Sequence, residues 1–444
     1  MATSWKGKIR IADILAHQSN WRRYIAWQGG RVRSAVFVNM RKVLLCRTIA
    51  LGVHLFRCPR CLTVKVVPHS CKSVLCTSCG VARTESWCRD LLSEVLDVKY
   101  RHLVFTLPWQ LRLVIQDNRD VLIPVLFRAV ADSILSLTVG TPEPKGRKSR
   151  RWRERCRRVP RMTPGFLVVL HTFGSDLKWN VHFHVVITGG GVRLDGKRWV
   201  HSPQRYMVPA PLLAMEWKLN VIEGIRAAHR KSPLYCRPLR SDPTRRFDVE
   251  KCLGFVRTHH WHIRLGPSLA KADGAVRYAC RYSKRPVIAE GRIVKYHHGY
   301  VSFLFKDYYK GGAYQCRKLP VLTFIHRLVQ HLPQRYVHQV RYYGLFATAV
   351  RAKALSQARQ LLEQRKRRRL QPLNWESRRK AVGDTKPLSC PQCGTTMIYW
   401  SLMFGAAIAM AMILGVNASE PIPPNLYIHA RTIHKRSSRV CLKT

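Results

Sequence analysis

The chain has 444 residues, of which 78 are lysine or arginine and only 24 are aspartate or glutamate, so its formal net charge at pH 7 is +54. Hydrophobic residues make up 46% of the chain, which excludes a disordered polyelectrolyte and allows two or three folded domains. A folded protein with this excess charge repels itself unless it meets a polyanion. We therefore expect nucleic acid as the partner, ahead of a membrane surface.

The predicted elements of the first half begin with helices in residues 1–40, where apolar residues recur at helical spacing. A strand is predicted from Leu103 to Leu107, before Pro108, and an amphipathic helix at 120–138. Residues 145–161 then carry ten basic residues and one acid. This run either contacts phosphates or is a solvated linker.

Two adjacent strands are predicted at 166–173 and 181–188, because the connection GSDLKWN has the length of a hairpin loop. A helix is predicted at 268–285, and a second hairpin around Gly299. From about residue 325 the chain is predicted to be helical and basic. Short strands with helices between them indicate an α+β fold with a central antiparallel sheet.

Six of the fifteen cysteines form three CxxC pairs, and no secretory signal opens the chain, which indicates a reducing compartment and metal binding. Two thiolates at this spacing share a tight turn and can face one ion. A second pair completes the tetrahedron of a structural Zn²⁺ site. We expect that site from Cys58, Cys61, Cys76 and Cys79, whose two pairs are separated by fourteen residues.

Other cysteines extend this expectation. Cys71 and Cys46 are candidates for exchanged ligands or for a second ion site, with buried thiols as the alternative. The later pair Cys390 and Cys393 is followed only by a lone cysteine, so we expect it to combine with a histidine or with another chain.

A histidine pair lies within the second predicted strand of the first hairpin. Side chains alternate along a strand, so His182 and His184 point to the same face, about 7 Å apart along it. That spacing allows two imidazoles to bind one divalent ion, and His171 on the neighbouring strand could supply a third. An H-x-H pattern alone more often marks ordinary histidines.

A tyrosine pair lies in the helix predicted at 268–285. Tyr278 and Tyr282 are four residues apart, so both rings lie on one helix face. A phenol with a pKa near 10 is a poor nucleophile at neutral pH, but nearby cations and a divalent metal favour the phenolate. The alternative is a pair of core aromatics. The candidate DNA-binding cations around the tyrosines are Arg277, Arg281, Lys284 and Arg285.

The local phrases and their order resemble the two-tyrosine HUH transposases of the insertion-sequence ninety-one type. The phrases are RCPRC…VPHSCKSVLCTSCG, HLVFTLP, LHTFGSDLKWNVHFHVVITGGG and YACRYSKRP, and the resemblance covers roughly residues 10–397. It implies a zinc-binding domain at 1–97, a nuclease domain at 98–318 with a basic insertion at 141–161, a basic helical region with a CxxC pair at 319–396, and a tail at 397–444.

The resemblance also implies an activity. His182 and His184, with His171 as our choice for the third ligand, would bind catalytic Mg²⁺ or Mn²⁺, and Tyr278 and Tyr282 would be nucleophiles. Such an enzyme nicks and rejoins single-stranded DNA through 5′-phosphotyrosine intermediates during rolling-circle transposition. No P-loop sequence occurs, so we expect no nucleotide cofactor and strand opening by a host helicase. The expected location is the bacterial cytoplasm, at the nucleoid.

Two other functions fit parts of the pattern. A plasmid replication initiator or relaxase uses the same chemistry, and a zinc-stabilised basic protein could bind nucleic acid without cutting it. The sequence also departs from the family in its arginine-rich run and in its tail. Residues 397–416 form an uncharged stretch long enough to span a bilayer, but we expect a buried or self-associating helix or an aberrant C-terminus there.

Overall fold

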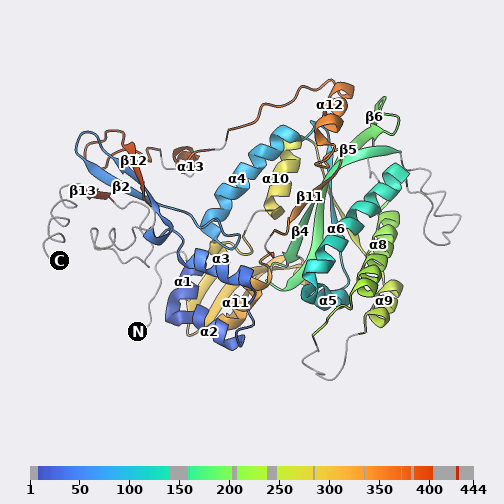
Figure 1. Cartoon of the computed structure of the whole chain (residues 1–444), viewed down its shortest axis with the longest axis horizontal. Helices are drawn as coiled ribbons and strands as arrows, with labels where there is room; N and C mark the ends of the chain where they lie inside the picture. The colour runs from blue at the N-terminus through green and yellow to red at the C-terminus, as the bar shows by residue number, and fades with distance from the viewer. Residues whose placement is uncertain are drawn as a thin grey trace. The chain divides into compact units, whose positions relative to one another are not determined.

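The computed structural model describes residues 9–140, 159, 161–202, 208–237, 248–283, 286–334, 336–371, 373–381, 385–403 and 427–429. The chain divides into two compact units (Figure 1). Unit 1 comprises Met1–Ser86, Lys284–Leu332 and Gln371–Thr444, and unit 2 comprises Trp87–Ser283 and Pro333–Leu370. Both units combine segments that are remote in sequence, unlike the consecutive domains expected above.

Unit 1 begins with the predicted N-terminal helices. They are α1 (Ile11–Ala16), α2 (Asn20–Trp27) and α3 (Ser34–Leu44), and α2 packs against α11 (Val321–Gln330). The Tyr24 hydroxyl and His326 Nδ1 lie 3.2 Å apart across this contact. The N-terminal helices therefore share a core with a helix from the second half of the chain.

The second predicted hairpin is confirmed in unit 1. Strands β8 (Ile293–His297), β9 (Tyr300–Asp307) and β10 (Ala313–Pro320) form a three-stranded antiparallel sheet. The turn residues His298 and Gly299 both have positive φ, 47° and 74°. Two such residues form the kind of two-residue turn whose twist matches that of the flanking strands.

A four-stranded sheet in unit 1 has the order β12-β1-β2-β13. Its strands are β1 (Val53–Arg57), β2 (Thr63–Pro68), β12 (Ile398–Met403) and β13 (Tyr427–His429). The expected helix at 397–416 is wrong at its start, because Ile398–Met403 pairs antiparallel with β1 as a strand. Its aromatic and β-branched residues suit a sheet edge. Residues 404–416 lie outside the described residues.

Unit 2 contains a six-stranded sheet, ordered β11-β4-β5-β3-β7, with β6 paired to β5. The predicted hairpin of β4 (Met162–Phe173) and β5 (Trp179–Arg193) is confirmed, and the pairings are antiparallel, so the fold is α+β as expected. The remaining strands are β3 (Tyr100–Thr106), β6 (Trp199–His201), β7 (Ile263–Leu269) and β11 (Val340–Gly344).

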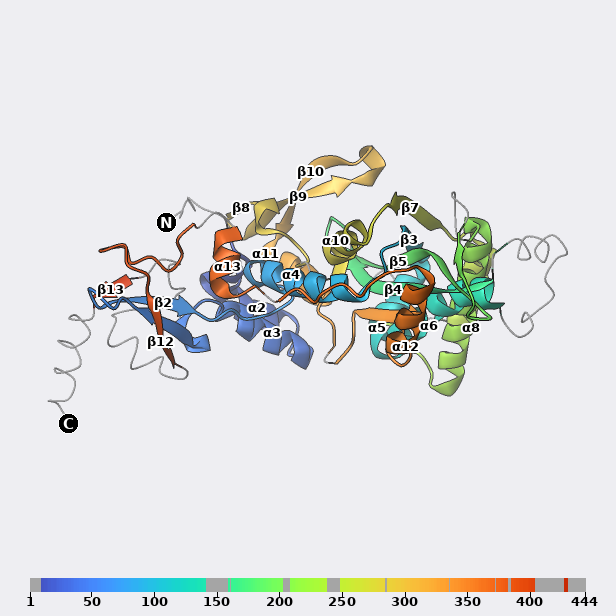
Figure 2. The same ribbon diagram turned by 90° about the horizontal axis from the view of Figure 1, so that it is seen from above.

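Helices lie on both faces of this sheet, as Figures 1 and 2 show, and each face carries a separate hydrophobic core. Phe183 and Val185 of β5 pack on one face with Trp217, and Val186 packs on the other with Val276. The first face is covered by α5 (Arg112–Asp117), α6 (Arg119–Leu135), α8 (Ala210–Lys231) and α9 (Val249–Thr258). The second is covered by α10 (Ala272–Ser283), α12 (Arg351–Leu361) and the end of α4 (Thr77–Glu94).

Two further expectations can be compared with the structure. The region from about residue 325 is not helical throughout, because Val340–Gly344 forms the edge strand β11 beside β4, between α11 and α12 and before α13 (Trp375–Ala381). Among the described residues, one helix, Arg119–Gly140, is long and apolar enough to cross a bilayer. It lies mostly buried in the core of unit 2, as a core helix does. Most of the basic run at 145–161 lies outside the described residues.

Candidate functional site

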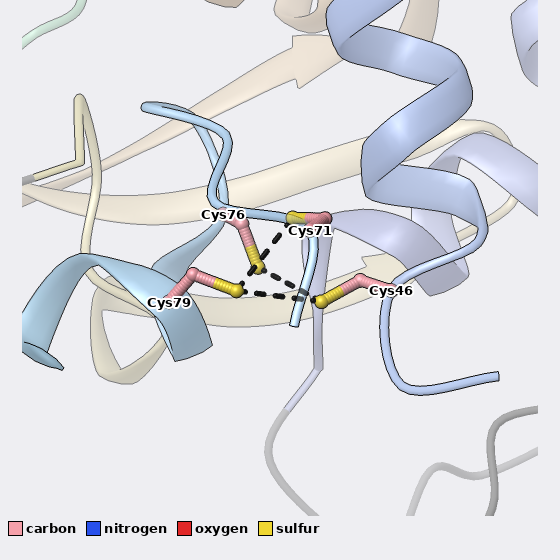
Figure 3. A group of neighbouring side chains, drawn as sticks. All are labelled: Cys46, Cys71, Cys76 and Cys79. Carbon is pink, nitrogen blue, oxygen red and sulfur yellow. Dashed lines mark hydrogen bonds between the residues drawn. The ribbon is translucent and has the colours of Figure 1, made fainter. Parts of the chain in front are cut away.

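Four cysteines converge in unit 1, as Figure 3 shows. Cys46 follows α3, Cys71 and Cys76 lie in the loop after β2, and Cys79 lies in the first turn of α4; all four are buried. The Sγ of Cys46 lies 3.5 Å from those of Cys76 and Cys79. Sulfurs bound to one Zn²⁺ at about 2.3 Å in a tetrahedron lie about 3.8 Å apart. The cluster therefore has the geometry of a closed structural zinc site.

The four thiols of this cluster share hydrogen bonds that shift their pKa values in opposite directions. Hydrogen bonds from Cys46, Cys71 and Cys76 lower the pKa of Cys79 far below that of a free thiol. The same kind of bond from Cys71 lowers the pKa of Cys46. Hydrogen bonds and burial raise the pKa of Cys71 and Cys76, so these two thiols would lose their protons on binding zinc, which takes the thiolate form.

The single zinc site expected from Cys58, Cys61, Cys76 and Cys79 is wrong, because the structure places the two pairs in different clusters. Cys58 and Cys61 form the turn between β1 and β2, whereas Cys76 and Cys79 follow the other end of that hairpin. Five strand residues at about 3.3 Å each separate the two ends by roughly 17 Å. The CxxC spacing identifies each pair but not its partner.

Three histidines lie together in unit 2, on neighbouring strands. His171 on β4 is directly opposite His182 on β5, and His184 follows on the same face. His171 Nδ1 lies 3.0 Å from His182 Nε2. One ring nitrogen from each of the three residues lies within 4.8 Å of the others. His171 therefore lies next to His182 and His184, as the predicted hairpin implied.

The histidines are held in the form that binds a cation. The Nδ1 of His182 lies 2.8 Å from the backbone oxygen of Asn180 and donates to it, so its Nε2 faces the cluster. Burial lowers the pKa of His182 and of His184, since a charged imidazole loses its hydration there. Both rings are therefore neutral at pH 7.

A fourth histidine, which the sequence analysis did not identify, adjoins this group. His102 on β3 is 2% exposed, and its Nε2 lies 3.0 Å from His184 Nδ1. Its ring also contacts that of Tyr278, with the centroids 4.2 Å apart. Burial lowers the pKa of His102 to about 4. The sequence contains His102 within HLVFTLP. It does not show the pairing register of β3 and β5, which places His102 beside His184.

Helix α10 carries the tyrosines across the sheet face that bears the histidines. It packs against β3, β4 and β5, and Tyr278 is half-buried on it. Cys280, between the tyrosines, forms a disulfide with Cys88 of α4, unlike the reduced thiols expected in a reducing compartment. Of the predicted DNA-binding residues, Arg277 is exposed. The side chains of Tyr282, Arg281, Lys284 and Arg285 lie outside the described residues.

Comparison with known proteins matches two families. Residues 165–354 match the family described as "Putative transposase", and residues 16–107 match "Transposase zinc-binding domain" of the IS91 kind. In both segments the chain is similar to the transposases of the insertion-sequence ninety-one type, and the matches support a transposase with an N-terminal zinc-binding domain. The transposase is therefore an enzyme of the nuclease and strand-transferase kind, with a zinc-binding domain, and its partner is DNA.

Two curated relatives resemble the transposase over most of its length. "Putative transposase y4qJ" of Sinorhizobium fredii is 29% identical over 324 residues, which cover 73% of this chain and 77% of the relative. "Transposase for insertion sequence element IS801" of Pseudomonas savastanoi pv. phaseolicola is 27% identical over 395 residues, 85% of this chain and 87% of the relative. No solved structure matches the transposase.

The matched segments cover most of the candidate site. The cysteine cluster of Figure 3 lies wholly within 16–107, whereas His171, His182, His184 and Tyr278 of the transposase lie within 165–354. Structural zinc therefore belongs to the matched zinc-binding domain. The pair Cys390 and Cys393 lies outside both matched segments.

Proposed function

We propose that this transposase nicks and rejoins single-stranded DNA through 5′-phosphotyrosine intermediates and moves its element by rolling-circle transposition. One observation carries the proposal: the three-histidine cluster and the helix that bears the tyrosines share one face of the central sheet. Within this proposal, the rings of Tyr278 and His184 are linked through His102, which contacts both.

The metal in this proposal is Mg²⁺ or Mn²⁺, bound by His171, His182 and His184. Three imidazoles, of which those of His182 and His184 are neutral, fit a divalent cation, and their close approach to one another suits a shared ion. Phosphate and water oxygens are the hard ligands that such an ion also takes. When bound, the ion would act as a Lewis acid on the phosphodiester.

The nucleophile in this proposal is the hydroxyl of Tyr278 or Tyr282. Its oxygen forms a bond to phosphorus, the bond from phosphorus to the 3′-oxygen breaks, and the phenolic proton leaves while the 3′-oxygen gains one. The phosphotyrosine ester retains the energy of the original bond, so the reverse attack by a 3′-hydroxyl rejoins strands without a nucleotide. Two tyrosines would allow one chain to hold two strand ends.

The surrounding cations would hold the DNA. Arg277 is exposed one residue from Tyr278, and phosphate contacts from such side chains position a strand without reading its sequence. Arg281, Lys284 and Arg285 remain candidates for the same role. Strand opening would come from a host helicase or from replication, and the enzyme would act at the nucleoid in the bacterial cytoplasm.

The test is covalent capture. The full-length protein is incubated with single-stranded oligonucleotides that span the two borders of its element, each labelled on the 3′ side of the expected nick, with Mn²⁺. We expect a labelled species of the protein's mass plus DNA on a denaturing gel, and none when a chelator replaces Mn²⁺. Strand binding by folded, zinc-loaded protein without any adduct would contradict the proposal.

A further inference from the structure

The turn between β1 and β2 is built as a metal-binding knuckle. Its sequence is CPRCLT, from Cys58 to Thr63. The backbone N–H of Cys58 donates to the oxygen of Thr63 at 2.8 Å, and that of Leu62 donates to the oxygen of Cys58 at 3.1 Å. These bonds make the turn tight, so that the thiols of Cys58 and Cys61 point to the same side.

A second turn, remote in sequence, repeats this construction. Its sequence is CPQCGT, from Cys390 to Thr395, just before β12. Here the N–H of Cys390 donates to the oxygen of Thr395 at 2.9 Å, and that of Gly394 donates to the oxygen of Cys390 at 2.9 Å. Gly394 has φ of 71° and the equivalent Leu62 has φ of 61°. The two turns thus share residue spacing, hydrogen bonds and backbone conformation.

The sulfurs of the two turns lie close to one another within unit 1. Cys58 Sγ lies 3.4 Å from Cys393 Sγ, and Cys61 Sγ lies 3.4 Å from Cys390 Sγ and 3.6 Å from Cys393 Sγ. These distances are close to the edge of a zinc–thiolate tetrahedron, about 3.8 Å, and far from a disulfide bond of about 2.05 Å. All four sulfurs lie within 4.8 Å of one another.

The environment of the four sulfurs is that of a closed site. Cys58 and Cys390 are 0% and 3% exposed and pack with the buried Met397. The Thr63 hydroxyl donates to the side-chain oxygen of Gln392 at 2.9 Å, which joins one turn to the other beside the sulfurs. A site with four protein ligands and no open position is structural rather than catalytic.

We propose that Cys58, Cys61, Cys390 and Cys393 bind a second structural Zn²⁺. Four thiolates in a tetrahedron select zinc and disfavour Mg²⁺ and Mn²⁺, which prefer oxygen ligands. The ion joins residues 329 to 335 positions apart and fixes the strand after the second turn, β12, to the edge of β1. Neither family match includes the second turn, so the zinc-binding domain of this chain is completed by its C-terminal part.

The first test counts metal in the purified full-length protein. Native mass spectrometry and elemental analysis should find two Zn²⁺ per chain. Substitution of both ions by Co²⁺ should give the visible absorption of tetrahedral cobalt–thiolate centres, with twice the intensity per chain of a one-site protein. One zinc per chain in the wild type, or iron in place of the second zinc, would overturn the proposal.

The second test assigns the ion to this cluster. The double substitution Cys390→Ser with Cys393→Ser should lower the zinc content from two to one per chain. Cys316→Ser changes an exposed cysteine outside both clusters and should leave two. Cys393→His keeps a ligand and should retain two zinc ions. Two zinc ions in the double-serine variant would overturn the assignment.

The third measurement separates zinc from disulfides. The wild-type protein is denatured with chelator and treated with an alkylating agent, without a reductant. Cys58, Cys61, Cys390 and Cys393 should all be alkylated, as the mass of their tryptic peptides shows. Peptides that carry Cys58 joined to Cys393, or Cys61 joined to Cys390, would overturn the proposal, because bonded cysteines cannot be zinc ligands.

Discussion

The Nε2 atom of His102 lies 3.0 Å from Nδ1 of His184, so an imidazole on β3 is hydrogen-bonded to an imidazole on β5. The two rings are nearly parallel, at 15°, with centroids 5.2 Å apart. If His184 uses Nε2 for the metal, its Nδ1 carries the proton and donates to His102. A hydrogen bond of this kind sets the tautomer and the orientation of a ligand.

The first prediction concerns His102 as a positioning residue. His102→Ala should weaken Mn²⁺ binding about 10- to 100-fold, the usual cost of losing a hydrogen-bond partner of a metal ligand. His102→Gln should retain most of the affinity, because its amide oxygen can accept from His184. Mn²⁺ affinity is measured by calorimetry, with thermal unfolding in the absence of Mn²⁺ as the control for stability. Equal affinity losses in both variants would contradict the role.

The second prediction uses Gly266 on β7. A Cβ atom at this position would collide with Nδ1 of His102, and β3 and β7 have a register shift here. Gly266→Ala should displace the His102 ring, cost about 1–3 kcal/mol of stability through overpacking, and weaken Mn²⁺ binding as His102→Ala does. The matched control is Gly254→Ala in α9, where nothing lies within 4 Å of the added carbon. Equal Mn²⁺ affinity in the two variants would argue against the contact.

The third prediction separates cleavage from binding. His182→Ala and His184→Ala should each abolish nicking of single-stranded DNA, because two imidazoles cannot hold the ion as three do. DNA affinity should change by less than about threefold, since neutral imidazoles contribute little to phosphate attraction. Adduct formation on a gel and binding by fluorescence anisotropy measure the two effects. A variant that still nicks with Mn²⁺ would exclude its histidine as a required ligand.

The fourth prediction concerns the tyrosines. Changing both Tyr278 and Tyr282 to Phe should remove the covalent adduct and leave zinc content and melting temperature unchanged, because only two hydroxyls are lost. The single variants should differ from each other, with one that still nicks but fails to transfer a strand. If the rings serve packing alone, both single variants and the double variant will form adducts at the wild-type rate.

The fifth prediction follows from the formal charge of +54. Raising salt from about 50 to 200 mM should weaken single-strand binding by a factor on the order of 10³ if six or more phosphates are neutralised. His182→Ala serves as the control, because its salt dependence should have the same slope as that of the wild type. An affinity that does not change with salt would show that phosphate contacts are not the main source of binding.

Much of the candidate site was predictable because it depends on neighbours in sequence. The alternation of side chains along β5 puts His182 and His184 on one face whatever the rest of the chain does. The short connection between β4 and β5 makes them a hairpin, and the hairpin register brings His171 opposite His182. The CxxC spacing likewise identifies cysteines that face one ion.

Only the tertiary structure decided which of these local pieces meet. Cys58 and Cys61 join Cys390 and Cys393 rather than the nearer pair, because the two ends of the β1–β2 hairpin point apart. His102 meets His184 because β3 pairs with β5 across 82 residues. Spacing and alternation are set by covalent geometry, which a short stretch of sequence contains. Strand order and remote pairing are set by the burial of whole sheet faces, which depends on residues throughout the chain.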